Sequence, residues 1–239
     1  LTALVGLFVF SQKKNLLHFK KPVFRFRVLA NAATNGCSEM ATALVTGIIT
    51  MMFNWTMLHY IGENGVAAVT IIMYVLMFAS SLYTGYSYGV APMISYYYGE
   101  KNYGKLKKLI AVSLKVITSI SVLTVAASFI LTKPLVSVFA RPENPVYELA
   151  VTGNRICTIA LFFIGFNIFA SGMFTALSNG VISAVLAFSR SFVFMLITML
   201  VLPAILGVNG IWMATPVAEL MALILSMAMF FKHRKRYGY

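Results

Sequence analysis

The amino-acid sequence predicts an all-α, polytopic membrane protein with six transmembrane helices. Hydrophobic residues make up 60% of the chain and charged residues only 10%, whereas a soluble domain carries roughly 25% charged residues. The mean hydropathy is +0.85. Six apolar segments each provide the ~20 residues that a spanning helix needs, and we place them at residues 30–60, 65–98, 108–132, 147–177, 180–206 and 209–231.

The stretch before the first segment is also apolar, but it is too short to cross a bilayer. Residues 1–10, LTALVGLFVF, have half the required length and lack the basic head and cleavage site of a signal peptide. We therefore interpret residues 1–19 as the tail of a preceding transmembrane helix and the start of a cytoplasmic loop. Residues 20–236 then form one lobe of six helices, and residues 237–239 form a cytoplasmic tail.

The net charge of +13 is distributed unevenly along the chain. Fourteen of the nineteen Lys and Arg residues precede the first segment, follow the second, or follow the sixth. These positions share one side of the membrane if the helices alternate in direction, and cytoplasmic loops carry such an excess. We therefore expect both ends of the six-helix unit to be cytoplasmic. Nucleic acid is not an expected partner, because no exposed basic domain with interleaved aromatic residues is present.

The second segment, residues 65–98, shows how a spanning helix packs and ends. Ser81, Gly85 and Gly89 recur every four residues, which places them on one helix face and predicts close approach of a neighbouring backbone. Pro92 removes one backbone hydrogen bond inside the helix. Three tyrosines at 96–98 then mark the depth at which aromatic rings anchor at the membrane interface.

Charges and turns set the other boundaries. The third segment begins after Lys108 and ends before Lys133. The fourth begins near Glu148, and Asn179 with its following glycine forms the turn into the fifth. The sixth ends at Lys232. Lys108, the turn at Asn179 and Lys232 therefore bound the segments on the side that we expect to be cytoplasmic, whereas Lys133 and Glu148 lie on the opposite side.

Sequence features of an enzyme are missing. The chain contains no aspartate, and neither Cys37 nor Cys157 has a second thiol or a histidine at metal-ligand spacing. No glycine-rich phosphate loop and no Gly-x-Ser-x-Gly motif occurs. We therefore expect a protein without catalytic residues and without an organic cofactor.

Five ionisable residues lie inside the expected spans. Lys115 and Arg155 are close enough to a membrane surface for their long side chains to reach it. Glu39, Arg190 and Glu219 are deeper, about 18, 16 and 20 Å from the cytoplasmic boundary at 1.5 Å per residue. These three lie near the middle of a hydrocarbon core about 30 Å thick. A charge at that depth costs at least ~2.5–3.5 kcal/mol, so such residues face a polar cavity or each other.

Depth also suggests partners for these residues. Arg190 and Glu219 lie on consecutive antiparallel helices, and we expect them to form an intramembrane ion pair. Glu39 then has no assigned partner. A lone carboxylate in a low-dielectric site can be neutralised by a proton or a cation, which a coupling site in a secondary transporter requires. Asn167 lies in the same layer.

One motif carries a family resemblance. The sequence GVAPMISYYYG at residues 89–99, followed by a short basic loop, resembles the MATE (multidrug and toxic compound extrusion) family of transporters. The later segments SRSFVFMLITMLVLP and GVNGIWMATPVAELMA are similar to the last two helices of that family. The resemblance covers about residues 22–236, which correspond to the C-terminal six-helix half of a twelve-helix member.

The resemblance implies roles for two residues. Glu39 in NGCSEM matches a glutamate in the first helix of the family's second half. Asn167 in FFIGFNIFASG stands where many members place an aspartate as a cation ligand. An amide oxygen can coordinate sodium but cannot hold a proton. The resemblance therefore implies a cation-coupling site at Glu39 and Asn167, with a possible sodium site at Glu39, and leaves sodium and proton as alternative coupling ions.

The sequence and the resemblance together thus predict the C-terminal lobe of a cation-coupled antiporter of the bacterial inner (plasma) membrane that exports organic, cationic drugs and toxins. Its expected partners are these small molecules, membrane lipids and an N-terminal lobe. Two alternatives remain. One is a flippase for lipid-linked sugars of related fold, which an arginine-rich cavity would favour and a single Arg190 does not. The other is a truncated membrane scaffold that transports nothing.

Overall fold

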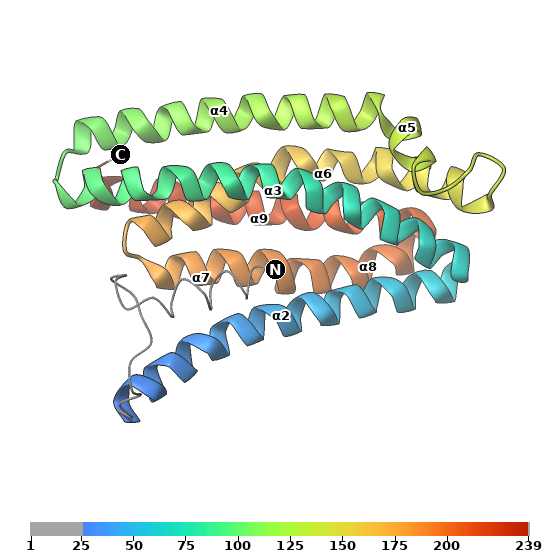
Figure 1. Cartoon of the computed structure of the whole chain (residues 1–239), viewed down its shortest axis with the longest axis horizontal. Coiled ribbons are helices and arrows are strands. Elements are labelled where there is room, and N and C mark those ends of the chain that lie inside the picture. Colours follow the sequence, from blue (N-terminus) through green and yellow to red (C-terminus); the bar gives the residue numbers. More distant parts are fainter. Residues whose placement is uncertain (1–25, 239) are drawn as a thin grey trace, which may run out of the picture. The chain divides into compact units, whose positions relative to one another are not determined.

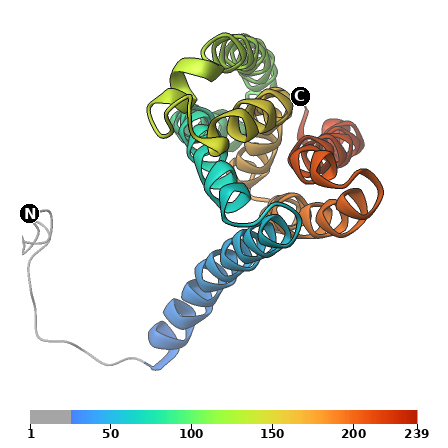
Figure 2. The same cartoon turned by 90° about the vertical axis from the view of Figure 1, so that its right-hand side faces the viewer.

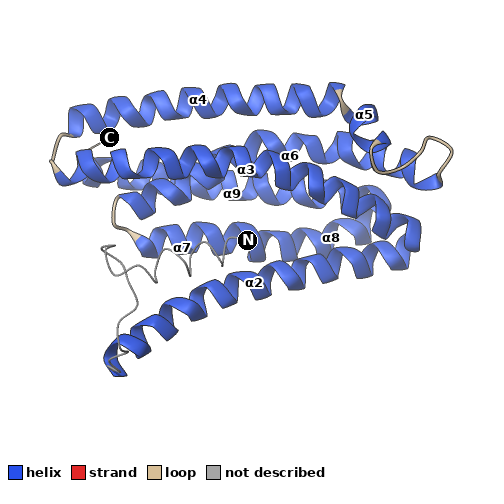
Figure 3. Ribbon diagram, viewed as in Figure 1, coloured by secondary structure: helices blue, strands red, loops and turns tan. Residues whose placement is uncertain are grey.

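Helices make up the described part of this computed structural model. It describes the backbone of residues 26–238, and the side chains of those residues except 27–43 and Lys235. No strand occurs in that part (Figure 3). Five of its helices are long and apolar enough to cross a membrane. The predicted all-α membrane fold is therefore confirmed, while the expected helix tail at residues 1–19 lies outside the described residues.

The chain divides into two compact units, residues 1–43 and 44–239. The described part of the first unit is helical backbone, the beginning of α2. The second unit begins within α2 and contains all the other helices. In chain order the helices are α2 (Phe26–Tyr60), α3 (Glu63–Gly99), α4 (Tyr103–Ile130), α5 (Thr132–Ser137), α6 (Pro145–Ala176), α7 (Gly180–Phe188), the π-helix η1 (Ser189–Phe194), α8 (Met195–Leu206) and α9 (Val208–Tyr237).

Helix α6 is the central helix of the second unit. It packs against α3, α4, α7 and α9, and the long helices run alongside one another (Figure 1). A view along them shows α6 between α4 and α9 (Figure 2). Glycines allow the close packing: a Cβ at Gly153 would lie 2.6 Å from Ile72, and one at Gly165 would lie 2.7 Å from Tyr83. Within lipid, no hydrophobic effect drives helices together, and small residues at the contacts let their backbones approach closely.

The small-residue face predicted for the second segment is uncovered in this unit. Ser81, Gly85 and Gly89 are all exposed, and a Cβ added at either glycine would meet nothing within 4 Å. The expectation that this face packs closely against a neighbouring backbone is therefore wrong for the described residues. The physical reason is that α3 turns a different face, which includes Ile72 and Tyr83, toward α6.

Asparagine caps begin three of the helices, α4, α6 and α7. Asn102, Asn144 and Asn179 each accept a backbone N–H of the next helix, at 3.2, 2.9 and 3.2 Å. Such caps satisfy donors that a helix start otherwise leaves without partners. Asn179 also donates its amide to the hydroxyl of Tyr237 at 2.7 Å. This bond ties the start of α7 to the end of α9.

The fifth segment forms one span, Gly180–Leu206, with the expected bounds. Its middle holds a feature that the sequence did not indicate, the π-helix η1 between α7 and α8. A π-helix widens one turn of the backbone and often occurs at functional sites. Here it carries Arg190.

Proline in α9 is accommodated by a neighbouring side chain. Pro216 lies inside the helix and cannot donate to the carbonyl of Trp212. The thiol of Cys157 on α6 donates to that carbonyl at 3.3 Å. A backbone group released within the membrane therefore regains a partner from the central helix.

Candidate functional site

A buried carboxylate lies at the contact between α9 and the π-helix. Glu219 is 5% exposed, and Arg190 donates its Nε–H to both carboxylate oxygens, at 2.8 and 3.0 Å. The two side chains form an ion pair. Because α9 and η1 belong to different spans, this pair joins two helices by a charge-assisted hydrogen bond.

Asn167 on α6 extends the cluster. Its amide nitrogen donates to a Glu219 carboxylate oxygen at 2.8 Å and to the Glu219 backbone carbonyl at 2.9 Å. Its amide oxygen accepts the hydroxyl of Ser226 at 3.1 Å. Asn167 is 2% exposed, so both ends of a fully buried amide are satisfied. We call Asn167, Arg190, Glu219 and Ser226 the Glu219 cluster.

The cluster brings together three of the four residues singled out from the sequence. Arg190 and Glu219 are paired, and Asn167 contacts Glu219. The fourth, Glu39, lies in α2, but its side chain is outside the described residues. Ser226 was missed by the sequence analysis, although it lies seven residues after Glu219, on the same helix face.

The electrostatics of the cluster favour a fixed, neutral arrangement. The carboxylate accepts from a guanidinium and from an amide, and the positive charge of Arg190 compensates its charge. In a low-dielectric interior a carboxylate with such partners is held in place. In the described part of the chain, no three His, Cys, Asp or Glu side chains are close enough to hold a metal ion.

A second candidate site is an open groove between α2 and α3. It has a volume of about 850 Å³, and its lining includes Thr50, Asn54, Trp55, Leu58 and Glu63. Trp55 is 69% exposed and stacks on His59 with ring centroids 6.2 Å apart. Glu63 is the only charged residue of the lining. We call this feature the α2–α3 groove. The sequence analysis did not identify it, because it depends on how α2 and α3 are oriented on either side of the turn at residues 61–62.

These features define a class of protein: a polytopic α-helical membrane protein with a buried ion pair between its spans and an open groove of ligand size. The MatE family model matches residues 40–201. The chain therefore belongs to the MatE family. No curated protein sequence matches it.

Solved structures share the fold. An inward-facing multidrug resistance MATE family transporter of the MOP superfamily has a TM-score of 0.84 at 20% identity, covering 99% of this chain and 54% of that chain. An outward-facing multidrug resistance MATE family transporter of the MOP superfamily has a TM-score of 0.78 at 20% identity, with 99% and 53% covered. A MOP superfamily transporter from Pyrococcus furiosus, described as having a binding pocket of reverse polarity, has a TM-score of 0.79 at 19% identity, also with 99% and 53% covered. The chain thus spans about half the length of these transporters.

Proposed function

We propose that this chain is one half of a cation-coupled antiporter that exports organic cations across a plasma membrane. Family membership supports transport as the general activity. A second six-helix half would complete the protein, since the solved transporters are about twice as long. The uncovered small-residue face of α3, which includes Gly85, offers that half a surface for close packing.

The α2–α3 groove carries the substrate part of the proposal. Its volume of about 850 Å³ lies within the range of small-molecule sites. The indole of Trp55 is exposed in it, and an aromatic face attracts a ligand cation. Glu63 adds one negative charge, and no Lys or Arg lines the groove. An organic cation with apolar substituents is the ligand chemistry that this combination matches.

Replacing Trp55 with alanine should raise the KM for efflux of a cationic dye several-fold, because the cation–π contact and its apolar surface are lost. Adding Glu63→Gln should raise it further. Efflux of a neutral dye should change less. The measurement is dye efflux from cells that produce the complete transporter at matched levels.

Leu44→Ala is a matched control, because Leu44 is also an exposed apolar residue of α2 and does not line the groove. Equal KM values for the cationic dye in wild type and Trp55→Ala would count against the groove as the substrate site. Protein stability should be unaffected, since a side chain that is 69% exposed contributes little packing.

The coupling part of the proposal rests on Glu39. Arg190 already compensates Glu219, so this pair is a fixed contact rather than an ion-exchange site. Both ends of the Asn167 amide are engaged in the Glu219 cluster, which leaves Glu39 as the primary candidate for the exchangeable proton or sodium ion. Asn167 can contribute only through the second lone pair of its amide oxygen.

Glu39→Gln should abolish efflux driven by an ion gradient while leaving substrate binding intact. The glutamine amide carries no negative charge and cannot take up and release a proton. Reconstituted vesicles with separate proton and sodium gradients would measure this and identify the ion. Glu143→Gln, a change of an exposed acid outside the spans, is the control. Gradient-driven efflux by Glu39→Gln at the wild-type rate would remove Glu39 from the coupling role.

A further inference from the structure

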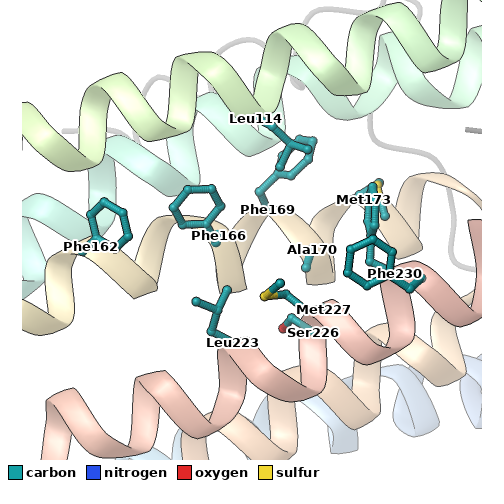
Figure 4. A pocket seen from close by; sticks show the side chains of 11 residues that line it. Leu114, Phe162, Phe166, Phe169, Ala170, Met173, Leu223, Ser226, Met227 and Phe230 are labelled. Atoms are coloured by element: carbon teal, nitrogen blue, oxygen red, sulfur yellow. The ribbon is translucent and has the colours of Figure 1, made fainter.

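A separate apolar groove lies between α4, α6 and α9 (Figure 4). Its volume is about 310 Å³, and its lining includes Leu114, Phe166, Phe169, Met173 and Phe230. Every lining side chain is apolar except Ser226, whose hydroxyl donates to Asn167. We call it the α4–α6–α9 groove. Its lining provides no charged group for a ligand to bind.

The groove has the length of one membrane leaflet. On α6 its lining runs from Phe162 to Met173, eleven residues or ~16 Å along the helix. Half of a hydrocarbon core about 30 Å thick is ~15 Å. A single acyl chain extends over that same depth. The groove therefore matches an acyl chain in length as well as in polarity.

Basic residues lie at one end of the groove. The end of α9 meets the start of α4 there, since a Cβ at Gly238 would lie 2.7 Å from the ring of Tyr103. On α4, Lys107 is exposed and lies two turns before Leu114, on the same helix face. On α9, Arg234 is exposed and lies one turn after Phe230. Both basic residues therefore lie beyond the groove, on the parts of α4 and α9 that leave the membrane.

We propose that the α4–α6–α9 groove binds an anionic phospholipid. One acyl chain occupies the groove, and the phosphate of the headgroup binds Lys107 and Arg234. Basic clusters between transmembrane helices recognise anionic headgroups in this way. An organic cation is a poorer match, because the lining has no carboxylate or other anion and the mouth is positively charged. This site is independent of the α2–α3 groove and of the transport proposal.

Two variants test separately the binding of the acyl chain and the binding of the headgroup. Met227 lines the groove and is 49% exposed, so Met227→Trp should fill the groove and abolish retention of lipid. The double variant Lys107→Gln, Arg234→Gln should leave the groove open and remove only the preference for an anionic headgroup. We expect wild type to retain phosphatidylglycerol about thirtyfold better than phosphatidylcholine, at roughly 1 kcal/mol for each of the two basic residues.

The measurement is native mass spectrometry of the complete protein in detergent after exchange into each lipid. Ile224→Trp is the matched control for size, because Ile224 is exposed on α9 and does not line the groove. Lys133→Gln with Arg141→Gln is the control for charge, because both residues are exposed in the region that joins α4 to α6. Both controls should behave as wild type.

Equal retention of the two lipids by wild type would overturn the proposal, as would wild-type retention by Met227→Trp. If Met227→Trp fails to fold, the double glutamine variant decides alone. It must lose the preference for phosphatidylglycerol while the Lys133, Arg141 variant keeps it. Loss of the preference in both would show that net charge, not this site, attracts the lipid.

Discussion

Replacing Glu219 with leucine should lower the free energy of unfolding by about 3–5 kcal/mol, the usual cost of leaving a buried charge without its partner. Arg190 would keep its positive charge inside the membrane with no compensating anion. The amide nitrogen of Asn167 would also lose its side-chain acceptor. Thermal unfolding of the purified protein in detergent micelles measures the change.

The double variant Arg190→Met, Glu219→Leu separates the cost of the unpaired charge from the cost of the missing pair. It removes both charges and keeps apolar side chains of similar length, so it should be more stable than Glu219→Leu alone. The single variant Arg190→Met completes the comparison. If the losses of unfolding free energy in the two single variants sum to the loss in the double variant, the residues are not energetically coupled, and the 2.8 Å contact contributes nothing to stability.

The second large effect is expected at the turn between α8 and α9. A Cβ on Gly210 would overlap the carbonyl group of Leu202 and would lie 2.7 Å from the nitrogen of Pro203. Backbone atoms cannot move aside as a flexible side chain can, so the two helices must separate. Gly210→Ala should therefore destabilise the protein by about 3 kcal/mol. It should also shift α9, and with it Glu219, relative to the π-helix.

Gly104→Ala is the control for this prediction. Gly104 lies in the first turn of α4, and an added Cβ would have only the side-chain oxygen of Asn102 nearby, at 3.9 Å. Alanine has the higher helix propensity, so stability should be unchanged or higher by up to about 1 kcal/mol. Equal unfolding temperatures for Gly104→Ala and Gly210→Ala would show that the contact at Gly210 is not tight.

Hydropathy and charge predict much of this fold, because the membrane limits the possible structures so strongly. A helix of about 20 residues crosses a bilayer and satisfies its own backbone hydrogen bonds there. The observed helices α3, α6 and α9 accordingly begin within two residues of the expected segments 65–98, 147–177 and 209–231. Helix α4 starts five residues earlier than expected, at Tyr103, because its basic first turns are helical outside the apolar segment.

The candidate site is predicted only in part. The sequence gives the depth of each residue in the membrane, but not the direction in which its side chain points around the helix axis. Counting residues gives depth, which is why Arg190, Glu219 and Asn167 could be assigned to one layer. Which of them touch depends on how far each helix is rotated about its axis. The π-helix at Ser189–Phe194 changes that rotation for Arg190, and its local sequence, SRSFVF, has no proline or glycine to signal it.

The sequence by itself determined the class of protein: the number of apolar segments, the asymmetry of charge and the presence of ionisable residues at mid-membrane depth. These features can be read from sequence because the bilayer limits the length and the polarity of every segment that crosses it. The tertiary structure decided which side chains meet. Asn167 joins Glu219, and the small-residue face of α3 stays uncovered. One groove forms between α4, α6 and α9, which are far apart in sequence, and another between the consecutive helices α2 and α3. Those outcomes depend on packing between helix faces, which no single segment encodes.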